Sequence, residues 1–116
     1  MLLCNPPYRD EAGELFPVEA SLDRWRALAP VHAADEHAAA LRSMTAIALD
    51  YGIDEQFAHI PETTQALSDA FAELRVAHDL FVYRGDHRAE VRERLARVVL
   101  PWIDSKLEPP GNDPGN

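Results

Sequence analysis

Positive charge and cysteine are both scarce in this chain. It has 11 lysines and arginines against 20 aspartates and glutamates, which gives a formal net charge of −9. Nucleic acids and anionic membrane surfaces are bound through basic faces, so this balance argues against both as partners. Cys4 is the single cysteine, which excludes a disulfide within the chain and any cysteine-based metal site.

Long apolar runs and a nucleophile motif are absent as well. No apolar stretch approaches the roughly 20 residues that a membrane-spanning helix needs. None of the four serines lies in a Gly-x-Ser-x-Gly frame, the turn on which many hydrolases carry their nucleophile; they are Ser21, Ser43, Ser68 and Ser105. The 116 residues, 47% apolar and 27% charged, suit one globular domain with one modest core.

The pattern along the chain predicts one domain over residues 1–107, followed by a tail. The first 20 residues of the domain are predicted to be irregular. Several prolines and Gly13 predict an irregular surface excursion over residues 1–20, and the Pro/Gly/Asn-rich residues 108–116 predict a disordered tail. Between these ends, apolar spacing predicts strands over 45–50 and 79–83. It also predicts helices over 21–29, 33–42, 61–74 and from Arg88 onward, the last of which Pro101 should kink or restart.

The order strand, helix, strand, helix indicates parallel strands joined by a right-handed crossover. Both predicted strands are almost continuously apolar, which is the pattern of strands covered on both faces. Two strands and a few helices are too little to provide that cover. We therefore expect an α/β fold in which this chain supplies the last parallel strands of a sheet with crossover and C-terminal helices. The sheet would be part of a larger one or would be completed by association.

Side chains capable of acid–base chemistry follow both predicted strands. His87 lies on a Gly-Asp-His turn after the second strand, and Asp54 and Glu55 lie in an acid-rich loop after the first. Functional groups gather at the carboxyl ends of parallel strands, and neighbouring strands are about 4.8 Å apart, so these loops would touch. Asp54 or Glu55, or Asp50 if the strand ends earlier, would then orient His87 as a general base. The alternative is that all are solvated loop residues.

The other histidines do not predict a metal site. His32 and His37 are five residues apart, which places them about 140° apart on a helix, whereas the helical zinc motif needs a spacing of four. His59 is expected to pack within its loop and His78 to be exposed. The arginines of the last helix, including Arg94, are interleaved with glutamates and predict a solvated face.

Several segments resemble the carboxyl-terminal half of esterases in the esterase D and S-formylglutathione hydrolase-like group, which have the α/β-hydrolase fold. The sharpest are the acid loop leading to Phe57 and the turn Tyr83-Arg84-Gly85-Asp86-His87. Further similarity extends over residues 5–15, 25–32, 91–95 and 99–102. The resemblance covers nearly everything up to Leu107.

This resemblance implies part of a serine carboxylic-ester hydrolase that acts on small-molecule esters and needs no cofactor. His87 falls on the catalytic histidine of the family. The family acid is usually an aspartate two positions before the phenylalanine; that position is Glu55 here, and Asp54 precedes it. The nucleophile serine and the oxyanion-hole loop belong to the amino-terminal half, which this chain lacks, so we expect the chain alone to be inactive.

Two other interpretations stay open at this point. In the first, the chain is a non-catalytic remnant of a hydrolase, and it folds only together with the missing amino-terminal half or as a homo-oligomer. Alternatively, it is a small-ligand-binding or interaction module that uses the strand ends without chemistry.

Overall fold

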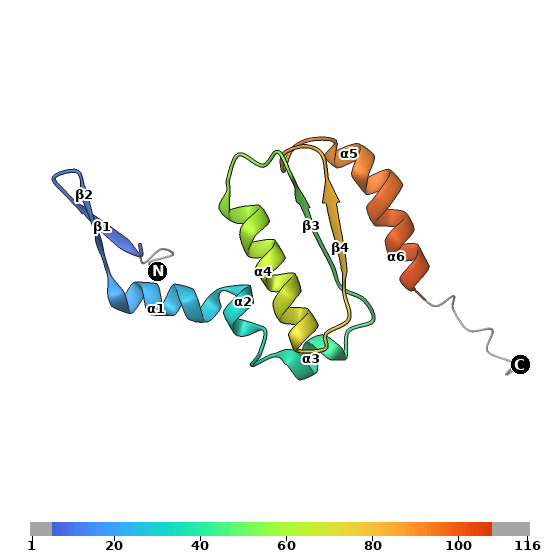
Figure 1. Ribbon diagram of the computed structural model, residues 1–116, viewed down its shortest axis with the longest axis horizontal. Coiled ribbons are helices and arrows are strands. Elements are labelled where there is room, and N and C mark those ends of the chain that lie inside the picture. Colours follow the sequence, from blue (N-terminus) through green and yellow to red (C-terminus); the bar gives the residue numbers. More distant parts are fainter. Residues whose placement is uncertain (1–5, 108–116) are drawn as a thin grey trace, which may run out of the picture.

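A two-stranded parallel sheet lies at the centre of the computed structural model, which describes residues 6–107 (Figure 1). Strand β3 (Ala48–Gly52) pairs with β4 (Asp79–Tyr83), with Tyr51 opposite Val82. Helix α4 (His59–Glu73) connects the two strands. The predicted mixed α/β fold with parallel strands is confirmed. The tail predicted over 108–116 lies outside the described residues.

The second strand has its predicted bounds, whereas the first is shifted from 45–50 to Ala48–Gly52. The reason is the position of its partner. Ala48 lies opposite Asp79, the first residue of β4, and the Ile47 carbonyl accepts the Asp79 N–H at 3.0 Å. Residues 76–78 are not in a strand, so residues 45 and 46 have no strand with which to pair. The shift extends the strand past Asp50 to Gly52 and leaves Asp54 and Glu55 in the loop.

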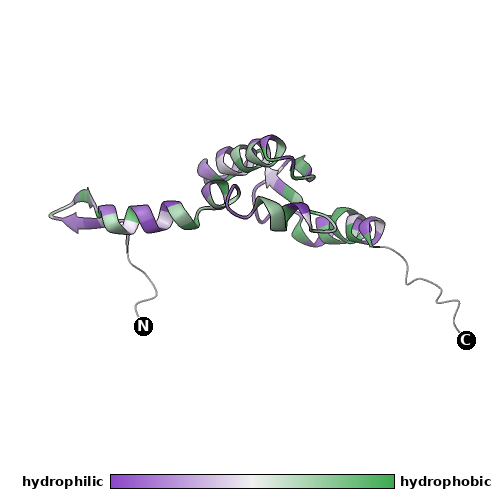
Figure 2. Ribbon diagram, turned by 90° about the horizontal axis from the view of Figure 1, so that it is seen from below, coloured by the Kyte–Doolittle hydropathy of each residue, from purple (hydrophilic) through white to green (hydrophobic). Residues whose placement is uncertain are grey.

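Helices cover the two faces of the sheet. The Tyr51 hydroxyl donates to Gln65 on α4 at 3.4 Å, whereas the neighbouring Asp50, on the opposite face of the strand, accepts from Arg94 at 2.6 Å. Arg94 ends α5 (Val91–Arg94), which continues into the π-helical turn η1 (Leu95–Val99) and α6 (Leu100–Lys106). These C-terminal helices lie on the opposite side of the sheet from α4 (Figures 1 and 2).

The far end of α6 is fixed to the start of β4. The Trp102 indole N–H donates to Asp79 Oδ2 at 2.7 Å, and the Lys106 ammonium lies 3.1 Å from the same oxygen. The hydrogen bonds from Trp102 and Lys106 hold the pKa of Asp79 below its usual range. Of the kink or new start predicted at Pro101, the structure shows a new start: α6 begins at Leu100, directly after η1, with Pro101 in its first turn.

The last helix begins at Val91 rather than near Arg88. Asp86 Oδ1 accepts the N–H groups of Arg88 and Ala89, both at 2.8 Å, and so holds residues 86–89 in a turn of their own. Glu90 then adopts a left-handed conformation with φ 55° before the helix starts. A side chain that bonds its own neighbouring backbone competes here with helix formation.

The predicted irregular excursion over residues 1–20 is wrong within the described residues, which form an antiparallel hairpin. Strand β1 (Tyr8–Glu11) pairs with β2 (Glu14–Pro17). The two turn residues, Ala12 and Gly13, both have positive φ, 56° and 88°, the conformation whose twist matches that of hairpin strands. Asp10 stabilises the turn by accepting the Gly13 N–H at 2.9 Å. The prolines lie at or beyond the strand ends, where they cost no ladder hydrogen bond.

The amino-terminal helices lie near their predicted positions with one difference. Helix α1 (Glu19–Leu28) ends before Pro30, close to the predicted 21–29. The single helix predicted over 33–42 is instead two, α2 (Pro30–Ala33) and α3 (Ala38–Arg42). Pro30 suits the first turn of a helix and starts α2 early, and His37, with φ −103° and ψ 10°, leaves the helical conformation between them.

The buried core is small. Phe71 of α4 and Val76 are buried with Ala34, and they form its centre. The partly buried residues packed against them come from α3, β3 and their flanks and from α4; they are Leu41, Ile47, Leu49, Leu67 and Leu74. The core therefore lies between α4 and one face of the sheet.

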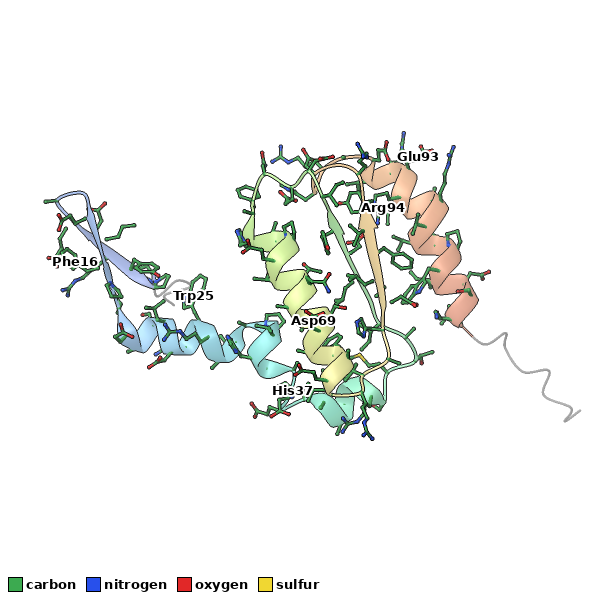
Figure 3. The ribbon with its side chains drawn as sticks, viewed as in Figure 1. Phe16, Trp25, His37, Asp69, Glu93 and Arg94 are labelled. Atoms are coloured by element: carbon green, nitrogen blue, oxygen red, sulfur yellow. The ribbon has the colours of Figure 1, made fainter. Side chains whose placement is uncertain are left out.

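Large apolar side chains remain exposed elsewhere. The hairpin and α1 form an arm that projects from the body (Figures 1 and 2), with Phe16 on the arm far from the sheet (Figure 3). The C-terminal helices expose Val91, Leu95, Leu100 and Ile103. The radius of gyration is 19.0 Å, against roughly 13 Å for a compact domain of this length. Much of the apolar surface therefore stays uncovered.

We expect Gly52→Ala to destabilise the fold by about 3 kcal/mol or more, because the added Cβ meets backbone that cannot easily move. It would lie 1.9 Å from the Gly85 carbonyl oxygen. Urea denaturation followed by circular dichroism measures the loss. The control is Gly13→Ala, whose Cβ meets nothing within 4 Å and whose positive φ costs about 1–2 kcal/mol. Equal losses in the two variants would contradict this role of Gly52.

Candidate functional site

The loops that follow β3 and β4 lie side by side at the same end of the sheet. Backbone pairing continues past the strands: the Ile53 N–H donates to the Tyr83 carbonyl at 2.9 Å, and the Asp54 N–H donates to the Gly85 carbonyl at 3.2 Å. The extended pairing brings the acid loop against the Gly85-Asp86-His87 turn.

Glu55 and His87 are hydrogen-bonded across this junction. His87 Nδ1 lies 2.9 Å from Glu55 Oε1 and 3.0 Å from Oε2. Glu55 Oε1 also accepts the Phe57 N–H at 3.2 Å. The Glu55 side chain is fully buried, whereas that of His87 is 37% exposed. The two residues therefore form an acid–imidazole pair with a sheltered acid and an accessible ring.

The Glu55 carboxylate is held in its ionised form. Burial by itself raises its pKa, but the hydrogen bonds from His87 and from the Phe57 N–H outweigh this effect and hold the pKa of Glu55 below its usual 4.5. A lowered folded-state pKa means that Glu55 stabilises the fold above pH 4.5 and that this contribution is lost as the pH falls through the folded-state value.

The pairing sets the tautomer of His87. An ionised carboxylate can only accept a hydrogen bond, so Nδ1 of His87 carries the proton and donates it to Glu55. The lone pair of the neutral ring is then on Nε2. A ring in this state can take a proton from a nucleophile, and the nearby carboxylate stabilises the imidazolium that results.

Neighbouring groups define the position and surroundings of the ring. The Phe57 ring lies 5.5 Å from the His87 ring, centroid to centroid, with the planes 34° apart. Asp86 pins the turn on which His87 lies, and the hydrogen bonds from the backbone N–H groups of Arg88 and Ala89 lower the pKa of Asp86. A pocket of about 210 Å³ borders His87; its other lining residues include Tyr83, Val91 and Leu95.

The acids near the strand end have different partners. Glu55 is hydrogen-bonded to His87, but Asp54 is not. Instead, Asp54 Oδ2 accepts the Gly85 N–H at 3.0 Å. Asp50, the alternative partner for His87, instead bonds Arg94. The structure thus brings His87 and Glu55 together as a pair and places Asp54 beside them in a backbone contact.

Arg94 lies beside the site, although its place in the sequence predicted a solvated helix face. Its side chain is only 13% exposed, and its guanidinium lies 3.6 Å from the centre of the Tyr83 ring. Figure 3 shows Arg94 on the helix beside β4. Burial, followed by the Asp50 carboxylate, raises the pKa of Tyr83. The alternation of arginines and glutamates in this helix predicts only a solvated face. It gives no sign of these contacts, because Asp50 and Tyr83 lie on the two strands and not on the helix.

His78 is likewise not the exposed residue that was predicted. Its Nε2 lies 2.7 Å from the hydroxyl of Ser68 on α4, and its Nδ1 lies 2.9 Å from the Val76 carbonyl. The Phe71 ring packs edge-on against it, with centroids 5.3 Å apart. Ser68 is buried at the end of the sheet opposite His87. This serine–histidine pair satisfies buried polar groups between α4 and the sheet.

Other kinds of site are not found in the described part of the chain. Across residues 6–107, no cluster of three or more histidine, cysteine, aspartate or glutamate side chains is arranged to hold a metal ion. No helix in that range has the length and apolarity to cross a membrane. A cavity of about 460 Å³ is lined by residues such as Leu49, Phe81 and Trp102, and His87 and Glu55 are not among its lining residues.

Comparison with known proteins gives no family assignment. No protein-family model matches the chain, and no curated protein matches it significantly.

We expect Glu55→Ala to change the tautomer of His87. In the unaltered protein at mildly alkaline pH the His87 proton should lie on Nδ1; without its acceptor it should move largely to Nε2, the preference of the free side chain. Long-range ¹H–¹⁵N spectra of ¹⁵N-histidine-labelled protein report this, with His87→Gln identifying the signal. The contribution of Glu55 to the free energy of unfolding should also shrink as the pH is lowered below 4.5.

The matched control for this test is Glu62→Ala, which removes an acid from the first turn of α4 and should leave the His87 signals unchanged. Identical His87 spectra for the unaltered protein and Glu55→Ala would show that the two side chains are not bonded in solution.

Proposed function

We propose that this chain is the C-terminal part of a serine ester hydrolase with the α/β-hydrolase fold, and that it supplies the histidine and the acid of the catalytic triad. The observation that carries the proposal is the bond between buried Glu55 and His87 Nδ1, which leaves Nε2 as the basic nitrogen of an accessible ring. Both residues follow parallel strands, and the acid precedes the histidine in the chain, as in hydrolases of this fold.

The reaction assigned to this pair is acyl transfer. Nε2 of His87 takes the proton of a serine hydroxyl as its oxygen attacks the ester carbonyl carbon, and the proton is then given to the leaving alkoxide as the ester C–O bond breaks. Water, deprotonated in the same way, releases the acid and restores the serine. Glu55 stabilises the imidazolium in both halves of the cycle and needs no cofactor to do so.

The serine that His87 would activate is assigned to the remainder of the hydrolase domain. The buried Ser68 bonds His78 instead, and no serine of this chain lies in a Gly-x-Ser-x-Gly frame. The activated nucleophile and the oxyanion donors account for most of the rate in such enzymes. An imidazole and a carboxylate without them give only weak catalysis.

We expect the chain alone to hydrolyse short-chain p-nitrophenyl esters no faster than His87→Ala, and no serine in it to react with a fluorophosphonate. Co-expression with the polypeptide encoded upstream of Met1, if that carries a Gly-x-Ser-x-Gly turn, should yield an active esterase. His87→Ala should then lower kcat by on the order of 10⁴-fold or more, and His32→Ala, remote from the site, should not.

Two results would contradict the proposal. One is rapid turnover by the chain alone with covalent labelling of one of its own serines. The other is a complemented esterase whose activity does not depend on His87.

The uncovered apolar surface supports a part-domain. The 460 Å³ cavity between the sheet and the C-terminal helices is lined by Phe81, Val98 and Trp102, and Val82 is 49% exposed. A larger sheet with its own helices would cover these residues. Each large apolar side chain left half covered forgoes on the order of 1 kcal/mol of burial, so several together rival the stability of a small domain.

We therefore expect the chain by itself to self-associate or to bind a dye that reports exposed apolar surface. Size exclusion with light scattering measures its mass, and dye fluorescence measures the exposed surface. A monomer that binds no dye and melts cooperatively would contradict the assignment to a larger domain.

A further inference from the structure

Asp54 makes two hydrogen bonds to one residue across the junction between the loops. Its N–H donates to the Gly85 carbonyl at 3.2 Å, and its Oδ2 accepts the Gly85 N–H at 3.0 Å. The side chain thus completes, by way of its carboxylate, the reciprocal pairing that the backbone begins. We call this pair of bonds the Asp54–Gly85 clamp.

The clamp lies next to both members of the acid–imidazole pair. Asp54 directly precedes Glu55, and Gly85 lies two residues before His87. The residues of the pair are 32 positions apart in the chain, so their distance depends on how the two loops are joined. A displacement of about 1 Å at such a junction is enough to cost roughly 100-fold in rate.

The backbone around the clamp leaves little freedom for another arrangement. Gly85 has φ 130°, and its carbonyl oxygen occupies the space that a Cβ on Gly52 would need. This orientation presents both the N–H and the carbonyl of Gly85 to Asp54. Asp54 is exposed, so its bond competes with water, but the neighbouring Ile53–Tyr83 bond already holds the loops in register.

We infer that Asp54 is a positioning residue, whose carboxylate holds the Gly85 turn against the acid loop so that His87 Nδ1 meets Glu55. It does not touch the imidazole and acts through the backbone. The inference rests on the proposed function for the use of His87 as a base, and it divides the two neighbouring acids between two tasks.

The test compares Asp54→Ala with Asp54→Asn, because the clamp needs an acceptor atom whereas a triad acid needs a charge. Asp54→Ala should shift the His87 tautomer from Nδ1–H toward Nε2–H although Glu55 is intact, and Asp54→Asn should restore it, since the amide oxygen can accept the Gly85 N–H. ¹⁵N-histidine spectra of the full chain report the tautomer.

Amide hydrogen exchange of Gly85 reports the clamp itself. In Asp54→Ala the Gly85 amide should exchange roughly tenfold or more faster, the change expected when one hydrogen bond to a charged acceptor is lost. The Ile53 amide should stay protected, which shows that the fold is retained. In the unaltered protein an unprotected Gly85 amide beside a protected Ile53 amide would overturn the inference without any variant, even if Asp54→Ala fails to fold.

Two further outcomes would overturn the positioning role. An unchanged His87 tautomer in a folded Asp54→Ala would show that Asp54 does not position the ring. Equal loss in Asp54→Asn and Asp54→Ala would show that its charge is what matters. Since neither measurement involves ester hydrolysis, failure of this inference is distinguishable from failure of the proposed esterase function.

Discussion

The close approach of the Gly85 carbonyl to Gly52 is the contact on which the candidate site depends. A Cβ on Gly52 would lie 1.9 Å from that oxygen, so the two loops can meet only where β3 ends in a residue without a side chain. Because they meet, the hydrogen bonding of the parallel strands continues to Ile53 and Asp54. Glu55 then follows directly, within reach of His87. The site is thus an extension of the sheet rather than an independent loop structure.

Each acidic side chain near the strand ends accepts hydrogen bonds from different donors. Only Glu55 bonds His87, and Nε2 of that ring stays available as a base. Asp50 bonds the largely buried Arg94, Asp54 bonds the Gly85 N–H, and Asp86 bonds the backbone of its own turn. Glu55 alone bonds an imidazole. Each of these carboxylates therefore has a donor of its own, and Asp50, Asp54 and Asp86 do not compete with Glu55 for the histidine.

The acid–imidazole pair and the exposed apolar side chains both support the proposal that this chain is part of a larger domain. The core between α4 and the sheet is centred on Phe71 and Val76, while the opposite face borders an open cavity and the hairpin arm projects outward. Parallel strands are normally covered on both faces. An ordered acid–imidazole pair, together with a sheet whose C-terminal helices leave a cavity beside it, fits the proposed part of a larger hydrolase domain.

Local chain chemistry determined the elements of this protein: the apolar run of β4, the amphipathic α4 and the placement of His87 just after a strand all followed from neighbours in the sequence. Contacts between distant residues decided the rest. Pairing with Asp79 set the start of β3, and the choice of Glu55 over Asp54 as partner of His87 depended on the register of two loops 32 residues apart. Arg94, 44 residues from Asp50, was hidden for the same reason. Spacing along a chain encodes which face a residue occupies, but a hydrogen bond depends on a partner that only folding brings near.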